Sequence, residues 1–224
     1  MRITAKLFLL FFLSLIYLKT LTAQEIISAK PDLTDPANIS HWTLDGSGLW
    51  KIDNGQLILY KAGIPAPEGS LRRPSALAIF KTKSMKQVNV EANIQSLVDT
   101  ATIHRDLEII VGYESPTRFY YVHLAGTTDK VHNGIFLVDN ADRKRIDNGK
   151  GIPQLKDKKW HHVQVTRDGD TGKIEVFVDG SKEPVLYAVD KTICCGQAGF
   201  GSFDDTGYFK NISINGTVDL SNNN

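Results

Sequence analysis

The sequence predicts an all-β fold made of antiparallel strands. Short runs of β-branched and aromatic residues recur along the chain, turn residues separate these runs, and no convincing helical periodicity remains. Because so many strands must each bury one face, we expect two sheets packed against each other. The predicted architecture is therefore a two-sheet antiparallel β-sandwich.

The predicted strands follow one another as short runs along the chain. In order they are residues 56–60, 75–80, 88–94, 107–113, 119–124, 134–138, 160–167, 174–178, 185–188, 199–203 and 209–214. The run from Val88 to Ile94 is typical, because its residues alternate between apolar and polar types, as in a strand with one buried and one wet face.

Turn residues between the runs indicate hairpin connections. Asp53-Asn54-Gly55, Asp179-Gly180 and the segment 168–172 contain residue types that tolerate positive φ. The longest predicted loop is 62–74, and residues 221–224 form a polar tail that we expect to be disordered. No repeat or linker divides the chain, so we expect one domain over residues 24–220.

The first residues have the pattern of a secretory signal peptide. A short basic segment, 1–6, precedes an apolar run, 7–18, which is too short to span a bilayer comfortably. Ala23 ends a plausible cleavage site, so the mature chain would begin near Gln24. An uncleaved anchor is the alternative. We expect a secreted or periplasmic protein of bacterial type that does not insert into a membrane after signal cleavage.

The charge balance bears on the class of partner. The formal net charge is +1 at pH 7, which gives no electrostatic reason to expect nucleic acid or an anionic membrane surface. We therefore predict no nucleic-acid partner. A local basic cleft for an acidic polysaccharide remains compatible with this balance, and the sequence does not predict the oligomeric state.

The two cysteines, Cys194 and Cys195, are adjacent. Adjacent cysteines can close only a strained ring, so a disulfide between them can form in an oxidising compartment but would not staple the fold. Two buried reduced thiols are the alternative. Zinc binding is poorly supported, because the sequence has no CxxC spacing and no second thiol pair.

A histidine inside an apolar run is the first candidate for function. Strand alternation places Phe119, Tyr121 and His123 on one face, while the residues between them have the character of core. The first set would then be a displayed row of aromatic and imidazole groups. It is either a ligand-contacting surface or the amphipathic outer side of a strand, in which His123 hydrogen-bonds across the sheet to Glu108 or another neighbour.

Two later segments resemble the C-terminal half of laminin G-like and concanavalin A-like jelly-roll domains. They are KKWHHVQVTRDGDTGKIEVFVDG, residues 158–180, and GQAGFGSFDDTGYFKNISING, residues 196–216. Residues 104–146, which begin HRDLEIIVGYESP, are similar to a block found in secreted bacterial proteins of this type. The resemblance implies a curved sandwich whose concave face or rim loops contact glycans.

That superfamily contains enzymes as well as binding modules, so enzyme candidates are weighed. Glycosidases of the family 16 type carry Glu-x-Asp-x-x-Glu on one strand, whereas the nearest approach here is Asp106-Leu107-Glu108 without a third carboxylate. Polysaccharide lyases typically neutralise a uronate with arginine and move a proton with tyrosine or histidine. If the protein is a lyase, the catalytic candidates are Tyr121, His123 and Arg105. The sequence does not assign a catalytic role to any of them.

We predict a carbohydrate-binding patch on the concave sheet, with a polysaccharide as partner. The predicted residues are Arg105, Glu108, Tyr121, His123, His132, Asn133 and Arg143. Tyrosine can stack on a sugar face, and the other side chains can hydrogen-bond hydroxyls or a carboxylate. A polysaccharide-active enzyme is the alternative, and an adhesion or protein-interaction domain is the third class.

No cofactor is required in this interpretation. A structural calcium ion is left open, with Asp204 and Asp205 as the candidate ligands, although one dipeptide cannot supply the six to eight oxygens of a hard cation. A turn is the structural alternative for the aspartate pair. For Arg143 the structural alternative is an exposed charged strand edge.

Overall fold

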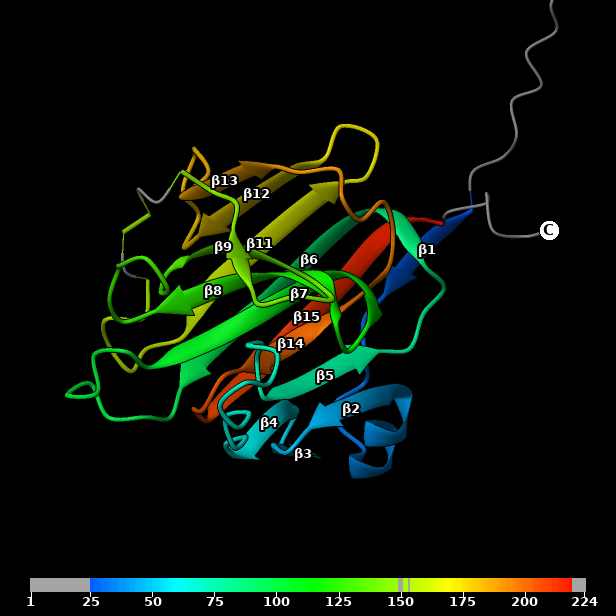
Figure 1. Ribbon diagram of the computed structural model, residues 1–224. Coiled ribbons are helices and arrows are strands. Elements are labelled where there is room, and N and C mark those ends of the chain that lie inside the picture. Colours follow the sequence, from blue (N-terminus) through cyan, green and yellow to red (C-terminus); the bar gives the residue numbers. More distant parts are fainter. Residues whose placement is uncertain (1–24, 149–150, 153, 219–224) are drawn as a thin grey trace, which may run out of the picture.

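Two antiparallel sheets pack against each other in the computed structural model, which describes residues 25–148, 151–152 and 154–218 (Figure 1). The predicted two-sheet β-sandwich is therefore confirmed. The predicted signal peptide and the predicted disordered tail lie outside the described residues. Over the described part of the chain, no helix combines the length and the apolar character needed to cross a membrane.

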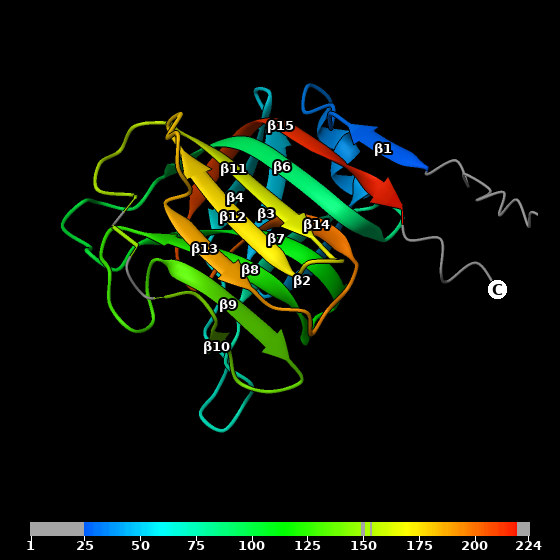
Figure 2. The ribbon, with the colours of Figure 1, turned by 90° about the horizontal axis from the view of Figure 1, so that it is seen from above.

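The larger sheet has eight strands, and its centre is formed by two long neighbouring strands from distant parts of the chain (Figure 2). Its order is β13 (Leu186–Val189), β12 (Lys173–Val178), β11 (His161–Asp168), β6 (Met85–Ser96), β15 (Gly207–Val218), β4 (Gln56–Lys61) and β3 (Leu49–Asp53), with β1 (Ile26–Ala29) paired to β15. Side chains of β6 alternate between buried and partly exposed, as its sequence predicts.

The second sheet has seven strands and carries the residues that the sequence singles out. Its order is β10 (Lys144–Arg145), β9 (Gly134–Asp139), β8 (Arg118–Ala125), β7 (Asp106–Ser115), β14 (Gln197–Ser202), β5 (Ala76–Phe80) and β2 (Trp42–Gly46). In the register of β7 with β8, Glu108 lies opposite His123, and in that of β7 with β14 it lies opposite Gly201.

Every predicted strand is present, but four strands and a short helix were not predicted. The missed strands are β1, β2, β3 and β10. Each is short, and apart from β1, which pairs only with β15, each lies at the end of a sheet. Edge strands bury little side-chain area, so their sequence pattern is weak. The helix η1 (Pro36–His41) is a 3-10 helix capped by Asp35, whose side chain accepts a hydrogen bond from the Ala37 N–H.

The apolar residues form two cores instead of one. The main core lies between the sheets and includes Tyr120, Val122 and Leu124, as predicted. A second cluster covers the outer face of the seven-stranded sheet and includes Phe119 and Tyr121. The exposed row predicted for this face is wrong, because Phe119 and Tyr121 are 0% exposed and His123 is 1% exposed.

The second cluster is buried because the loop predicted at 62–74 folds back over it. Leu71 from this loop and Phe203 after β14 are the partly buried residues that pack against the cluster. This face of the sheet is therefore covered in part by that loop.

The adjacent cysteines are joined in a disulfide. Cys195 is buried, and the carbonyl oxygen of Cys194 accepts a hydrogen bond of 2.8 Å from Arg167. The guanidinium carbon of Arg167 also lies 4.7 Å from the centre of the Tyr120 ring. Hydrogen bonds from Arg167 to backbone carbonyl oxygens thus attach the segment to the core.

Replacing both Cys194 and Cys195 by serine is expected to lower the free energy of unfolding by less than about 2 kcal/mol, because a bridge between neighbours closes no long loop in the unfolded chain. Thermal melts of the variant and the wild type measure the change. A much larger loss would show that the pair contributes through packing and not through chain entropy.

Candidate functional site

A cavity of about 410 Å³ opens between the 62–74 loop and the outer face of the seven-stranded sheet. Its wall on the loop side comes from residues 65–70, Arg72 and Arg73. Charged, imidazole and aromatic groups line the rest, namely His104, Asp106, His123, His132, Asp142, Arg143, Phe203 and Asp204. The cavity therefore lies between the second apolar cluster and loops that carry charged and imidazole side chains.

A buried hydrogen-bond network forms the floor of the cavity. Nε2 of His123 lies 3.1 Å from Oδ2 of Asp106, while Oδ1 of Asp106 accepts hydrogen bonds from the Ser202 hydroxyl at 2.6 Å and the Phe203 N–H at 3.2 Å. Burial raises the pKa of Asp106, but the hydrogen bonds and charge of His123 together with the Ser202 and Phe203 donors outweigh it, so the pKa is lowered. Asp106 is therefore an ionised carboxylate that orients His123.

Glu108 lies beneath the same histidine in the opposite electrostatic state. Its Oε1 is 3.8 Å from Nε2 of His123, and among the described residues neither carboxyl oxygen has a hydrogen-bond partner. Burial first, and then the nearby Asp106 carboxylate, raise the pKa of Glu108 well above its usual value. The pKa values of two acids two residues apart are thus shifted in opposite directions, which favours an ionised Asp106 and a protonated Glu108.

Arg143 is held in the cavity wall by aromatic neighbours. Its Nη1 donates a 3.0 Å hydrogen bond to the Tyr121 hydroxyl, and its guanidinium carbon lies 4.2 Å from the Phe203 ring centre and 5.1 Å from that of Phe136. Burial raises the pKa of the Tyr121 phenol above its ordinary value, so this hydroxyl stays neutral. Tyr121 therefore positions Arg143 and does not itself line the cavity.

Two more histidines continue from the floor to the rim. The rings of His123 and His132 are 5.4 Å apart between centres, and those of His132 and His104 are 4.6 Å apart. Nδ1 of His132 lies 2.8 Å from Oδ2 of Asp129. Burial lowers the pKa of His132 and outweighs the opposing effect of Asp129, which favours a neutral imidazole at the rim.

The structure brings only part of the predicted patch together. His123, His132 and Arg143 line the cavity, whereas Glu108 and Tyr121 lie directly behind them. The remaining two predicted residues face the loop backbone instead.

Arg105 and Asn133 support loops. The Arg105 guanidinium donates to the carbonyl oxygens of Thr100, Thr102 and Leu155. The Asn133 amide donates to the Ile152 carbonyl. Of the three lyase candidates, His123 alone lines the cavity, so these residues do not form one catalytic group at an accessible surface.

Several lining residues were not predicted as part of the patch. In the sequence, Asp106 stands out only as a fragment of a glycosidase-like motif, and Phe203 only within a segment that resembles jelly-roll domains. Arg72 and Asp142 are brought together by the fold, because the Arg72 N–H donates a 2.8 Å hydrogen bond to Oδ1 of Asp142. The sequence feature that points to these residues is the length of the 62–74 loop, because long loops in compact domains are often functional.

Asp204 and Asp205 lie close to Asp106, with one oxygen of each carboxylate within 4.8 Å of the others. Burial and the Asp106 charge raise the pKa of Asp204, and they raise that of Asp205 to about 7. The fit to calcium is poor: Oδ2 of Asp205 already accepts the Asp106 N–H, and both Asp106 oxygens are engaged by protein partners. The three residues offer too few free oxygens for a hard cation.

No protein-family model matches the chain, and no curated protein matches it. Solved structures do match. A carbohydrate-binding module, CBM66 from Bacillus subtilis, shares 15% identity over 78% of this chain and 94% of its own, with a TM-score of 0.59.

Two plant lectins are also similar. The winged bean acidic lectin, complexed with methyl-α-D-galactose, has 12% identity and a TM-score of 0.54 over 87% of this chain and 100% of the lectin. Lectin I from Ulex europaeus, in complex with the methyl glycoside of α-L-fucose, has 9% identity and a TM-score of 0.53 over 87% and 98%. At these identities the likeness establishes the fold, a jelly-roll sandwich of the concanavalin A-like type.

Proposed function

We propose that the protein binds carbohydrate in the cavity over the seven-stranded sheet. The observation that carries this proposal is a preformed cavity in which Arg143, His123 and Asp106 are fixed by buried partners beside the Phe203 ring. Sugars are bound by aromatic faces together with a few well-placed polar groups. Fixing these groups in advance reduces the entropy lost on binding.

The lining carries both signs of charge, which suits a ligand rich in hydroxyl groups. Arg72 and Arg143 can donate hydrogen bonds, whereas Asp204 can accept them. An acidic sugar would place its carboxylate at the arginines, where a guanidinium binds it with two hydrogen bonds. The similar carbohydrate-binding module and glycoside-bound lectins support the general class of ligand.

The compartment and the metal requirement belong to the same proposal. The signal-like first residues support an encounter with the glycan outside the cytoplasm. Because an oxygen of Asp205 and both oxygens of Asp106 are already engaged by protein partners, we propose that binding does not depend on calcium.

A polysaccharide-active enzyme is the second candidate, and one observation favours it. Asp106 and Asp204 both line the cavity with carboxylate oxygens within 4.8 Å, and the pKa of Asp106 is lowered while that of Asp204 is raised. A pair of carboxyls with opposite shifts can divide the roles of base and acid. However, both oxygens of Asp106 are held by protein partners, so binding is the stronger interpretation.

Arg143→Ala is expected to weaken binding about tenfold or more, through the loss of roughly 1 to 3 kcal/mol of charged hydrogen bonds. Tyr121→Phe, which keeps the ring but loses the hydroxyl that accepts from Arg143, should have a smaller effect. A glycan array identifies the ligand, and calorimetric titration then measures the affinity of each variant.

Arg118→Ala is the matched control, since Arg118 lies on the same strand as Tyr121 but pairs with Glu114 and Asp139 away from the cavity. Unchanged affinity in Arg143→Ala would contradict the proposed site. Assays for new reducing ends and for the ultraviolet absorbance of unsaturated uronides, run on the same ligands, separate the two functions. Product from the wild type that is lost in Asp204→Asn would favour the enzyme.

A further inference from the structure

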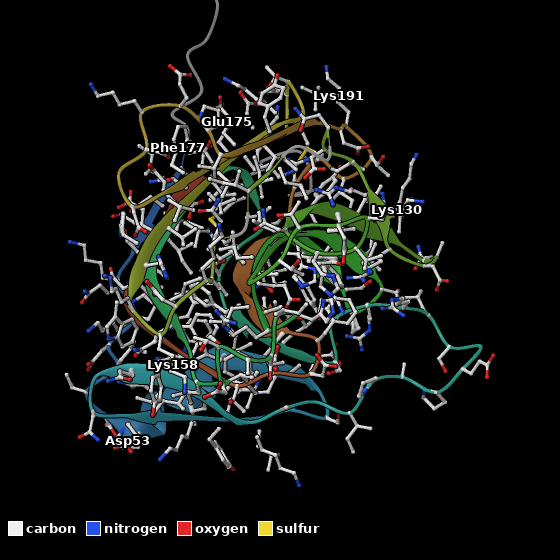
Figure 3. The ribbon with its side chains drawn as sticks, turned by 90° about the vertical axis from the view of Figure 1, so that its left-hand side faces the viewer. Asp53, Lys130, Lys158, Glu175, Phe177 and Lys191 are labelled. Atoms are coloured by element: carbon white, nitrogen blue, oxygen red, sulfur yellow. A yellow bond between two sulfur atoms is a disulfide. The ribbon has the colours of Figure 1, made fainter. Side chains whose placement is uncertain are left out.

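A second hollow lies on the other side of the sandwich, on the outer face of the eight-stranded sheet. It encloses about 400 Å³ between the β3–β4 hairpin and the aromatic residues Trp160 and Tyr208. Figure 3 labels one residue near each site. Asp53, which lines this hollow, is at the lower left, and Lys130, two residues before His132 of the first cavity, is at the right. The two sites therefore share no residue.

Two rings form one wall of this hollow. The register places Tyr208 of β15 opposite Gln95 of β6, and Trp160 immediately precedes β11 on the other side of β6. The two rings therefore approach each other above Gln95, with their centres 6.1 Å apart and their planes inclined by only 25°. Together they present aromatic surface next to water, where an antiparallel strand normally carries polar residues.

The Trp160 ring is held in place without a ligand. Nζ of Lys210 lies 3.9 Å from its centre, and Lys210 is not among the residues that line the hollow. An ammonium group over an indole face is attracted by the ring quadrupole and restricts the ring's rotation. The aromatic wall is thus fixed before binding.

The opposite wall supplies hydrogen-bonding groups without net charge. Asn54 and Gln56 from the hairpin contribute amides, and the Tyr60 side chain is exposed, at 50% for the residue. The two charged lining residues, Lys51 and Asp53, neutralise each other through a 2.9 Å ion pair. Positive φ at Asn54 and Gly55 gives the hairpin the tight turn that directs these residues toward the rings.

We propose that this hollow is a second carbohydrate site, specific for a neutral glycan chain. Aromatic faces match the C–H face of a pyranose ring, and amides match its hydroxyl groups. A charged polymer would find no uncompensated charge among the described lining residues, in contrast to the arginine-containing cavity across the sandwich.

Intrinsic fluorescence tests the proposal directly. The chain has three tryptophans, and Trp42 and Trp50 are buried at 3% and 6% exposure, so Trp160 is the tryptophan that an external ligand reaches. Neutral oligosaccharides from β-glucan, xylan and mannan are titrated in turn. At least one is expected to shift the emission to shorter wavelength with saturation.

Variants separate this site from the first cavity. Tyr60→Ala, at a half-exposed position that the fold tolerates, and Tyr208→Ala should each weaken the neutral glycan by about tenfold, because each removes a ring from the site. Trp160→Ala should do the same in affinity electrophoresis, which does not depend on the fluorescence of this tryptophan. Phe177→Ala, which removes an aromatic ring of the same sheet that does not line the hollow, is the matched control.

Arg143→Ala distinguishes failure of this proposal from failure of the first. Neutral-glycan binding that survives Arg143→Ala but is lost in Tyr60→Ala supports the second site, whatever the first cavity binds. Binding lost in Arg143→Ala and kept in the hairpin and aromatic variants would overturn it. An emission spectrum unchanged by every neutral glycan would overturn it as well, as would a response to a peptide ligand alone.

Discussion

Asp106→Ala is expected to lower the free energy of unfolding by about 3 to 5 kcal/mol, the largest effect of any change near the cavity. The substitution removes the carboxylate on which His123, the Ser202 hydroxyl and the Phe203 N–H converge. These partners are buried or partly buried and would lose hydrogen bonds that water cannot easily replace. Urea unfolding followed by circular dichroism measures the loss.

Asp204→Ala is the control for this measurement. Asp204 lines the same cavity, but its side chain is exposed, so its removal should change stability by less than about 0.5 kcal/mol. A double-mutant cycle with His123→Ala then isolates the coupling of the pair, expected at about 1 to 3 kcal/mol. A loss below about 1 kcal/mol in Asp106→Ala would show that the network is not formed in solution.

Glu108→Gln is expected to stabilise the protein at alkaline pH and to leave it nearly unchanged at about pH 5. The pKa of Glu108 is raised in the folded state, so above the ordinary glutamate pKa the unfolded chain loses this proton while the folded protein retains it. Wild-type stability therefore falls as pH rises from that ordinary pKa to the raised one. A glutamine has no proton to lose, so the variant escapes this loss.

Thermal melts between about pH 5 and about pH 8 give the comparison. We expect the melting temperature of Glu108→Gln to exceed that of the wild type by at least about 2 °C at the upper end, the shift that roughly 1 kcal/mol produces in a domain of this size. Asp205, with a pKa raised to about 7, titrates in the same range and its charge helps to raise the pKa of Glu108, so the difference reports Glu108 together with this interaction. Parallel pH profiles of the two proteins would contradict a protonated Glu108.

The sequence predicts local features of the site well and its enclosure poorly. Strand alternation correctly puts Phe119, Tyr121 and His123 on one face, and Glu108 does lie opposite His123. His123 nevertheless hydrogen-bonds to Asp106, at the diagonal position, and not to Glu108 directly opposite. The pairing register gives the opposite residue but does not determine which neighbouring side chain forms the hydrogen bond. Periodicity thus gives the face of a residue and not its partner.

Burial of that face depends on a loop that is distant in sequence. Nothing within the run 119–124 indicates that Leu71 will cover it, since alternation reports only the strand itself. The role of Arg105 cannot be predicted from the sequence for a similar reason. A basic residue beside a polar patch is equally suited to bind a ligand or to donate hydrogen bonds to carbonyl oxygens of nearby loops. Its three backbone acceptors lie in loops whose paths the sequence does not predict.

The position of the last two strands governs how this chain can be assembled. In the eight-stranded sheet β15 stands between β4 and β6, and in the seven-stranded sheet β14 stands between β5 and β7. Among the described strands, β3 and β4 in one sheet, and β2 and β5 in the other, are therefore joined to the other strands of their sheets only through strands that come much later in the sequence. Pairing over such separations carries a large loop-closure cost and slows folding. Strands β6 and β11 to β13 of one sheet, and β7 to β10 of the other, can pair without β14 and β15, but joining them to the early strands, and so completing the sandwich, requires these last two strands.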